Sequence, residues 1–350
     1  MKKFDYKTLN NLTITAEMAK KIALIFELRG KLSVSLKPKS VALDRLVEVA
    51  KIQSTDSSNR IEGIYTSQGR LRQLMAEKTM PQNRSEEEIS GYRDVLKLIL
   101  EQSEYMPLNS KTILTLHKHL FNFTSSSWAG KYKDSDNQII TNYKDGHSEI
   151  RFIPPSSTVT PELVDELCQK YTLALEEDHF VKILLVGAFV FDFVSIHPFN
   201  DGNGRMSRLL TLIFLYQNGY DVGKYISIEK LIERTKDQYY SSLQESSEGW
   251  SDNKNSYEPF LNYFLSVMLQ AYRELTERID FTEGTKHSAK ELIFKNLENE
   301  LRPLSKSELV ALIPDYSQTT IERSLGELVA ANRITKIGVG RATKYINRIV

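Results

Sequence analysis

The sequence of 350 residues is poor in cysteine and in net charge, and each shortage excludes a class of protein. Because Cys168 is the single cysteine, the chain can form neither an intrachain disulfide nor a cysteine metal cluster, which is typical of a reducing cytoplasm. A formal net charge of +1 provides no overall attraction to nucleic acid or to a membrane surface. We therefore expect a cytoplasmic protein whose function resides in a local site.

Long apolar runs are also missing. The first residues, MKKFDYKTLNNLTITAEMAKK, contain no apolar core like that of a signal peptide. The longest apolar run, from Val181 to Ile196, contains Lys182 and Asp192 and is shorter than the roughly 20 residues that a membrane span needs. We interpret it as a buried central helix and expect no membrane partner.

Apolar residues recur at spacings of three and four through most of the chain, which predicts a mainly α-helical fold. The predicted helices span 16–29, 41–53, 86–102, 110–121, 161–176, 181–196, 204–217, 228–245 and 257–279. One segment differs, because two short β-prone runs, Gln138–Thr141 and Glu149–Ile153, flank Asp145-Gly146. This segment predicts a β-hairpin on a helical body.

A short polar stretch near residue 284 separates the C-terminal region from the rest. Helical patterns at 288–297, 306–312 and 317–331 follow it, and then the strand–glycine–strand pattern RITKIGVGRATKYINR. Three helices and a hairpin resemble a winged helix-turn-helix, which we predict for residues 285–350.

The stretch HPFNDGNGRMSR follows the buried helix directly and has the residue types of a phosphate site. The small loop Gly202-Asn203-Gly204 runs into the next helix, so backbone N–H groups and the helix N-terminus can bind an anion. Arg205 and Arg208 share one face of that helix and suit a polyphosphate. The pattern predicts a nucleotide site.

Two further residues of this stretch predict chemistry on the phosphates. A carboxylate beside phosphates, here Asp201, usually implies Mg²⁺. His197 is the group of this stretch that can accept a proton near neutral pH. We therefore predict transfer of a nucleotide-type group to a hydroxyl that His197 deprotonates.

The stretch resembles the signature of Fic-domain proteins, His-Pro-Phe-x-Asp-Gly-Asn-Gly-Arg-x-x-Arg, at every fixed position. The resemblance implies a Fic core over residues 106–280 that transfers AMP from ATP to a Ser, Thr or Tyr hydroxyl of a protein or of the chain itself. The hairpin, residues 137–153, is similar to the family's flap, which docks the target by strand addition. Matching positions imply these roles: general base for His197, magnesium ligand for Asp201, phosphate loop for Gly202, Asn203 and Gly204, and β/γ-phosphate contacts for Arg205 and Arg208.

A second match lies in the N-terminal helical region, residues 1–105. Ser58-x-x-x-Glu62-Gly63 is similar to the family's inhibitory motif and implies an N-terminal inhibitory helix. A glutamate paired with Arg208 would occupy the arginine that should hold the γ-phosphate.

The helix after the signature departs from the family's pattern. Relatives often carry Asn-Arg-x-x-Tyr-Tyr, and this chain has Thr235-Lys236-Asp237-Gln238-Tyr239-Tyr240. Threonine in place of asparagine leaves the preference for ATP over other nucleotides open. Tyr239 is expected either to stack on the base or to pack within the helical core.

Other charged and histidine residues have simpler interpretations. His117 and His119 are two apart on a helix and point away from each other, so they predict no metal site. We expect Glu86-Glu87-Glu88 to be a solvated first helical turn.

Residues 285–350 carry eleven Lys or Arg and seven Asp or Glu, a net charge of +4. The helix 317–331 opens with polar residues able to reach base edges, and Arg341 and Lys344 lie in the wing, but Glu322 and Glu327 share the helix. DNA binding and protein docking therefore both remain open for this region.

The leading prediction is an autoinhibited protein adenylyltransferase, with a homodimer as a common arrangement in the family. Two alternatives use the same residues. Glu62 would orient a water molecule that removes AMP from a modified protein, or the chain would be a DNA-binding regulator whose core senses nucleotide.

Overall fold

A computed structural model of the chain describes residues 2–6, 9, 12–35, 41–142, 148–282, 288–299, 303–313, 316–340 and 343–347. The predicted Asp145-Gly146 turn, the boundary near residue 284 and Arg341 lie outside these residues. In the part that is described, the fold is mainly α-helical, as predicted, and no helix is long and apolar enough to cross a membrane.

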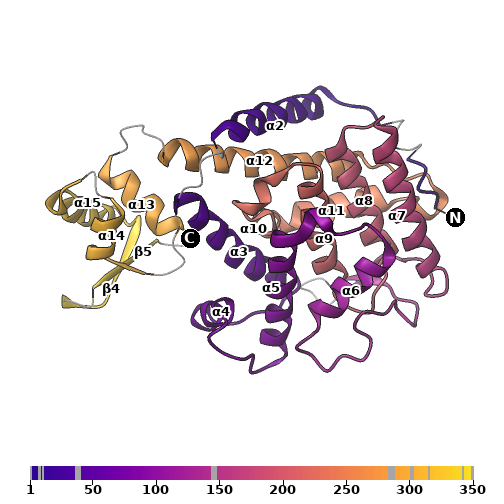
Figure 1. Cartoon of the computed structure of the whole chain (residues 1–350), viewed down its shortest axis with the longest axis horizontal. Helices are drawn as coiled ribbons and strands as arrows, with labels where there is room; N and C mark the ends of the chain where they lie inside the picture. The colour runs from indigo at the N-terminus through magenta and orange to yellow at the C-terminus, as the bar shows by residue number, and fades with distance from the viewer. Residues whose placement is uncertain are drawn as a thin grey trace. The chain divides into compact units, whose positions relative to one another are not determined.

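The chain divides into two compact units (Figure 1), Met1–Lys37 with Ala50–Glu274 and Pro38–Val49 with Leu275–Val350. Up to residue 282 the helices are α2 (Ala16–Ser35), α3 (Val41–Ile61), α4 (Gln68–Met75), α5 (Arg84–Gln102), α6 (Ser110–Leu120), α7 (Thr160–Glu177), α8 (Lys182–Ile196), α9 (Asn203–Gln217), α10 (Ile228–Arg234), α11 (Lys236–Ser247) and α12 (Glu258–Thr282). Short 3-10 turns are η1 (Ser103–Tyr105), η2 (Asp221–Lys224) and η3 (Trp250–Asp252).

Helix α8 forms the centre of the first unit and lies between α7 and α9 (Figure 1). Nearly all of its residues are buried, as expected of a helix that is apolar on all sides. At Gly187 a Cβ atom would lie 2.5 Å from a Leu261 methyl carbon of α12, so glycine lets the two helices approach closely. The predicted buried central helix is confirmed.

The predicted hairpin is also confirmed, with strand ends shifted by one residue. Strands β1 (Ile139–Asn142) and β2 (Ser148–Phe152) pair antiparallel, with Ile140 opposite Ile150. Strand β2 packs against α11, where the Arg151 guanidinium lies 5.1 Å from the ring centroid of Tyr240.

Two of the predicted helices need correction, and one helix was not predicted. The single helix predicted over 228–245 is two helices, because Thr235 leaves the helical conformation and its hydroxyl donates to the Leu231 carbonyl and bonds the Tyr263 hydroxyl. Periodicity continued across the break because both helices bury apolar residues. Helix α4 was not predicted, since it is short, and α3 extends to Ile61.

The second unit contains α13 (Ala289–Asn299), α14 (Lys306–Leu312) and α15 (Gln318–Ala330). A three-stranded antiparallel sheet has the order β3 (Leu304–Ser305), β5 (Lys344–Asn347), β4 (Ile334–Ile337). Its core includes Ile293, Leu309, Ile321, Leu325 and Ile334. The helices and the β4–β5 pair lie near their predicted positions, whereas the two-residue strand β3 was too short to predict.

Candidate active site

His197 directly follows α8 and turns the chain toward the loop of small residues. Its backbone is left-handed, with φ 50° and ψ 61°, and its N–H donates to the Phe193 carbonyl at 3.2 Å. A non-glycine residue rarely adopts this conformation, and such strain often occurs at functional sites. The side chain at this turn is partly buried.

The electrostatic surroundings keep the His197 ring neutral near pH 7. The pKa of His197 is lowered to about 4, first by burial and then by the charges of Lys133 and Arg151, although the Val194 carbonyl and Glu62 act in the opposite direction. A neutral imidazole has a free lone pair and can accept a proton.

The loop before α9 is braced from within. Gly202 has φ 82°, and a Cβ atom there would lie 2.8 Å from the Phe121 ring, so glycine is required. The Asn203 side chain accepts from the Phe199 N–H at 2.9 Å and donates to the Phe199 carbonyl at 2.8 Å. These bonds hold the first amides of α9 at the positive end of the helix, which suits an anion.

A carboxylate already lies at this helix N-terminus. A Cβ atom on Gly204 would be 2.1 Å from Oε1 of Glu62 and 3.2 Å from Nη1 of Arg208. Glu62 therefore contacts the Gly204 backbone directly. The negative charge of Glu62 occupies the place that the loop offers to an anion.

Arg208 is held by the end of α3. It is 3% exposed, and its Nε donates to the Ser58 hydroxyl at 2.8 Å while Nη2 donates to the Ser58 carbonyl at 2.9 Å and to Glu62 Oε1 at 2.8 Å. Gly63, with φ 78°, ends the helix and carries the chain away.

The Glu62–Arg208 pair is ionised. Burial opposes ionisation of Glu62, but the Arg208 charge and hydrogen bond, aided by Arg205 and Lys236, outweigh it and hold the pKa of Glu62 below its usual value. Burial likewise opposes the charge on Arg208, and Glu62 raises the pKa of that guanidinium overall. Both partners therefore keep their charges at neutral pH.

Arg205 faces a different direction from Arg208. It is 1% exposed, with Nη1 donating to Glu88 at 2.6 Å and Nη2 to Asp201 at 3.3 Å. Its guanidinium lies over the Phe121 ring. In this arrangement Arg205 joins the loop to α5, and the phosphate contact implied by the resemblance stays a prediction.

The expectation of a solvated turn at Glu86-Glu87-Glu88 is wrong. Glu86 and Glu88 are 3% and 4% exposed. Glu86 pairs with Arg70 at 2.6 Å, and Glu88 pairs with Arg205. The buried partners Arg70 and Arg205 lie 16 and 117 positions away, so a local charge run could not indicate burial.

Asp201 is the carboxylate of this loop for which the sequence predicts a magnesium ion. Its side chain is 43% exposed, and Oδ1 accepts from the Gly202 N–H at 2.6 Å. In the described ranges, no group of three His, Cys, Asp or Glu residues is arranged to hold a metal. Mg²⁺ on substrate phosphates often takes only one or two protein carboxylates, so the exposed Asp201 side chain is compatible with that role, which stays a prediction.

Sequence reasoning missed the part that His117 takes in the loop. His117 is fully buried, its Nδ1 accepts from the Gly130 N–H at 2.9 Å, and its Nε2 lies 3.0 Å from the Asp201 carbonyl. Because Nδ1 accepts, Nε2 carries the proton and donates to Asp201. The ring stacks on Phe199 at 3.7 Å, and burial lowers the pKa of His117 to about 4. The sequence carried no local signal for a contact across 84 positions.

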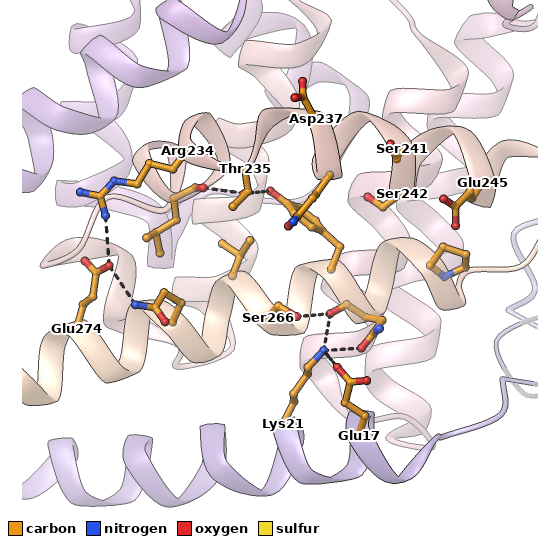
Figure 2. Close-up of a pocket in the computed structure, with 17 residues that line it drawn as sticks. Glu17, Lys21, Arg234, Thr235, Asp237, Ser241, Ser242, Glu245, Ser266 and Glu274 are labelled. Carbon is orange, nitrogen blue, oxygen red and sulfur yellow. Dashed lines mark hydrogen bonds and ion pairs between the residues drawn. The ribbon is translucent and has the colours of Figure 1, made fainter. Parts of the chain in front are cut away.

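Tyr239 is 5% exposed and packs beside Tyr240 and Tyr263. Core packing therefore explains it without a nucleotide, and base stacking stays a prediction. A cavity of about 840 Å³ lies elsewhere, and Thr235 lines it together with Lys21 and Glu17 of α2 (Figure 2). None of the described residues that line this cavity belongs to the stretch from His197 to Arg208. The candidate active site therefore rests on the side chains of that stretch and their contacts, and this cavity is separate from it.

Comparisons with known proteins indicate the family that this chain resembles. Residues 107–215 match the family model described as "Fic/DOC family". Protein adenylyltransferase Fic of Aedes aegypti is 27% identical over 222 residues, 61% of this chain and 41% of the relative. The chain spans about half the length of the curated relatives that it matches.

Two solved structures show the same fold. A Fic family protein from Desulfovibrio desulfuricans has a TM-score of 0.60 at 20% identity, covering 96% of this chain and 97% of that one. A Fic domain containing signaling protein from Bacteroides thetaiotaomicron has a TM-score of 0.62 at 23% identity, covering 75% of this chain and all of its own.

Proposed function

The chain carries a domain of the Fic/DOC family, and on that premise we propose that it is a protein adenylyltransferase restrained by its own Glu62. It would move AMP from ATP to a Ser, Thr or Tyr hydroxyl of a protein target, or of itself. The observation that carries the proposal is the position of the Glu62 carboxylate, which lies against Gly204 and bonds Arg208 at the anion-binding end of α9.

In the proposed reaction His197 takes the proton of the target hydroxyl. The hydroxyl oxygen forms a bond to the α-phosphorus of ATP, the bond from that phosphorus to the bridging oxygen breaks, and pyrophosphate leaves. The loop amides and the helix N-terminus stabilise phosphate charge. Asp201 would hold Mg²⁺, which supplies further neutralisation of the phosphates. These residues supply positioning and electrostatics, the main sources of catalysis in such transfers.

Glu62 would restrain ATP binding both by its negative charge and by occupying the anion site and Arg208. A phosphate entering beside Gly204 meets the ionised Glu62 carboxylate at the same helix end. Arg208, which should hold that phosphate, already donates three hydrogen bonds to Ser58 and Glu62. ATP can therefore bind in a productive pose only when the Glu62 side chain moves away from Gly204 and Arg208.

Hydrogen bonds along the last two turns of α3 attach this part of the helix to α10 and α11, which supports a regulatory role for Glu62. The Ser54 hydroxyl donates to Glu229 at 2.7 Å and the Ser57 hydroxyl to Glu233 at 2.7 Å. Lys236 then donates to the Ile61 carbonyl at 2.6 Å, one residue before Glu62. This series of bonds to α10 and α11 holds Glu62 in place.

The test is self-labelling with radioactive ATP. Glu62→Gly should raise incorporation of AMP by tenfold or more, because it frees both Arg208 and the anion site, and a tenfold change needs only about 1.4 kcal/mol. Adding His197→Ala should abolish the gain. The matched control is Glu77→Gly. Like Glu62, Glu77 follows the end of a helix and pairs with a cationic side chain, but its partner Lys97 lies on the surface. Unchanged labelling by Glu62→Gly would sink the assignment of restraint.

Removal of AMP from a modified protein is the second candidate. Glu62 is 31% exposed, and its charge acts on His197, so its carboxylate is accessible to water near the base. Self-modified Glu62→Gly protein, incubated with the wild-type chain, provides the substrate. Release of free AMP would establish this activity, and a stable modification would exclude it for this substrate.

Docking of the target on residues 137–153 is part of the proposal, and strand addition to the hairpin is the mode that its geometry suits. A homodimer and DNA contact by residues 285–350 are not needed for the reaction. Within α15, Glu322 and Glu327 pair with Lys306 and Lys290, so these carboxylates are partly neutralised.

A further inference from the structure

One buried lysine near the site has no part in the reaction described above. Lys133 precedes the hairpin and is 3% exposed. Burying an ammonium group is costly unless hydrogen bonds replace its water. Among the described residues it forms hydrogen bonds to neutral oxygens, and burial lowers its pKa to about 8. A buried lysine whose ammonium group is bonded to such oxygens indicates a specific structural or electrostatic role at that position.

Lys133 forms hydrogen bonds to the residues directly before and after His197. Its ammonium donates to the Ile196 carbonyl at 3.3 Å, and its main-chain N–H donates to the Pro198 carbonyl at 2.9 Å. The residues on either side of His197 are thus tied to the same lysine. Asn137 orients the ammonium through a bond of 3.0 Å to its Oδ1.

These bonds fall where α8 ends and the backbone is strained. The last carbonyls of a helix have no partner within it, and a cation there is favourable. His197 itself adopts φ 50°, which must be imposed by its surroundings. Lys133 supplies that constraint from both sides.

Groups from four parts of the chain influence the protonation of the His197 ring. Lys133, from the segment before the hairpin, and Arg151, on β2, disfavour protonation. Glu62, after α3, and the Val194 carbonyl of α8 favour it. Lys133 is the stronger of the two cations.

We propose that Lys133 is a positioning residue that holds His197 in its left-handed conformation and favours the unprotonated ring. This inference rests on the proposed function, in which His197 is the base. It assigns Lys133 an effect on the base through backbone bonds and charge, without contact to substrate.

The first experiment titrates the His197 ring by NMR in the chain of 350 residues, and this readout does not depend on activity. Lys133→Met should raise the pKa of His197 by about one unit, the usual effect of removing a nearby like charge. Lys133→Arg keeps the charge and should leave the value nearly unchanged. Lys131→Met, an exposed lysine two positions away, is the matched control and should cause no shift. An unchanged pKa in a folded Lys133→Met chain overturns the proposal.

The second experiment measures the pH dependence of AMP transfer in the Glu62→Gly background. Lys133→Gln, which keeps a hydrogen-bond donor and is the milder variant if Lys133→Met fails to fold, should move the acidic limb to higher pH. A fall in rate with no movement of that limb would show a merely structural residue and refute the electrostatic role. If Glu62→Gly itself transfers no AMP, the proposed function fails, while the NMR titration still decides the role of Lys133.

Discussion

The buried pair of Glu88 and Arg205 makes the sharpest stability prediction. Their atoms are 2.6 Å apart, and the two side chains are 6% and 1% exposed. Glu88→Ala leaves a buried guanidinium, and removing one partner of such a pair costs about 3–5 kcal/mol. Asp201 remains at 3.3 Å from Arg205, so we expect the lower end, about 3 kcal/mol. Arg84 also pairs with Glu88, at 2.7 Å, but its side chain is 67% exposed, so it turns to water at little cost after the substitution.

Urea unfolding followed by tryptophan fluorescence measures this loss. Both tryptophans, Trp128 and Trp250, lie in the first compact unit, so the signal reports on that unit alone. With a slope of about 3 kcal/mol per molar urea, the midpoint should fall by about 1 M. The control is Glu87→Ala, the adjacent glutamate on the same helix turn, which should change the midpoint little. A loss below about 1 kcal/mol for Glu88→Ala would refute the reasoning from burial.

Two further predictions concern the hydrogen bond that holds the end of α3 and the loss of stability at acid pH. Lys236→Met removes the bond to the Ile61 carbonyl and should raise self-labelling when Glu62 is present, but not in Glu62→Gly; a fall in both backgrounds would instead give Lys236 a role in transfer. Glu86 has a pKa lowered to about 2, first by the Arg70 hydrogen bond, so its contribution is full above the unfolded value of about 4.3 and is lost as pH falls toward 2. The difference in urea midpoint between wild type and Glu86→Gln should therefore shrink between about pH 5 and pH 2, and a constant difference would contradict the shift.

The parts of the fold that could be predicted are those with a local cause. The all-apolar run of α8 predicts a buried helix, and the two β-prone runs around a turn signal predict a hairpin. The break at Thr235 could not be predicted, because a tyrosine hydroxyl from α12 takes part in it. Periodicity reports which face is buried, and it does not report which distant side chain interrupts the helix.

The candidate site divides in the same way. Its signature is contiguous, so the residue types of the loop, the base and the two arginines were all readable from the sequence. The sequence alone determined that a tight loop of small residues follows a buried helix, because backbone conformation there depends on neighbouring glycine, asparagine and proline residues.

Only the tertiary structure decided what each side chain faces. It turns Arg205 toward Glu88 across 117 positions, places Glu62 against Gly204, and brings Lys133 to both sides of His197. The two arginines share a helix face in the sequence, yet one is bonded to α5 and the other to α3. Burial and long-range pairing set these directions, since a buried charge must find its partner wherever the packed helices present one.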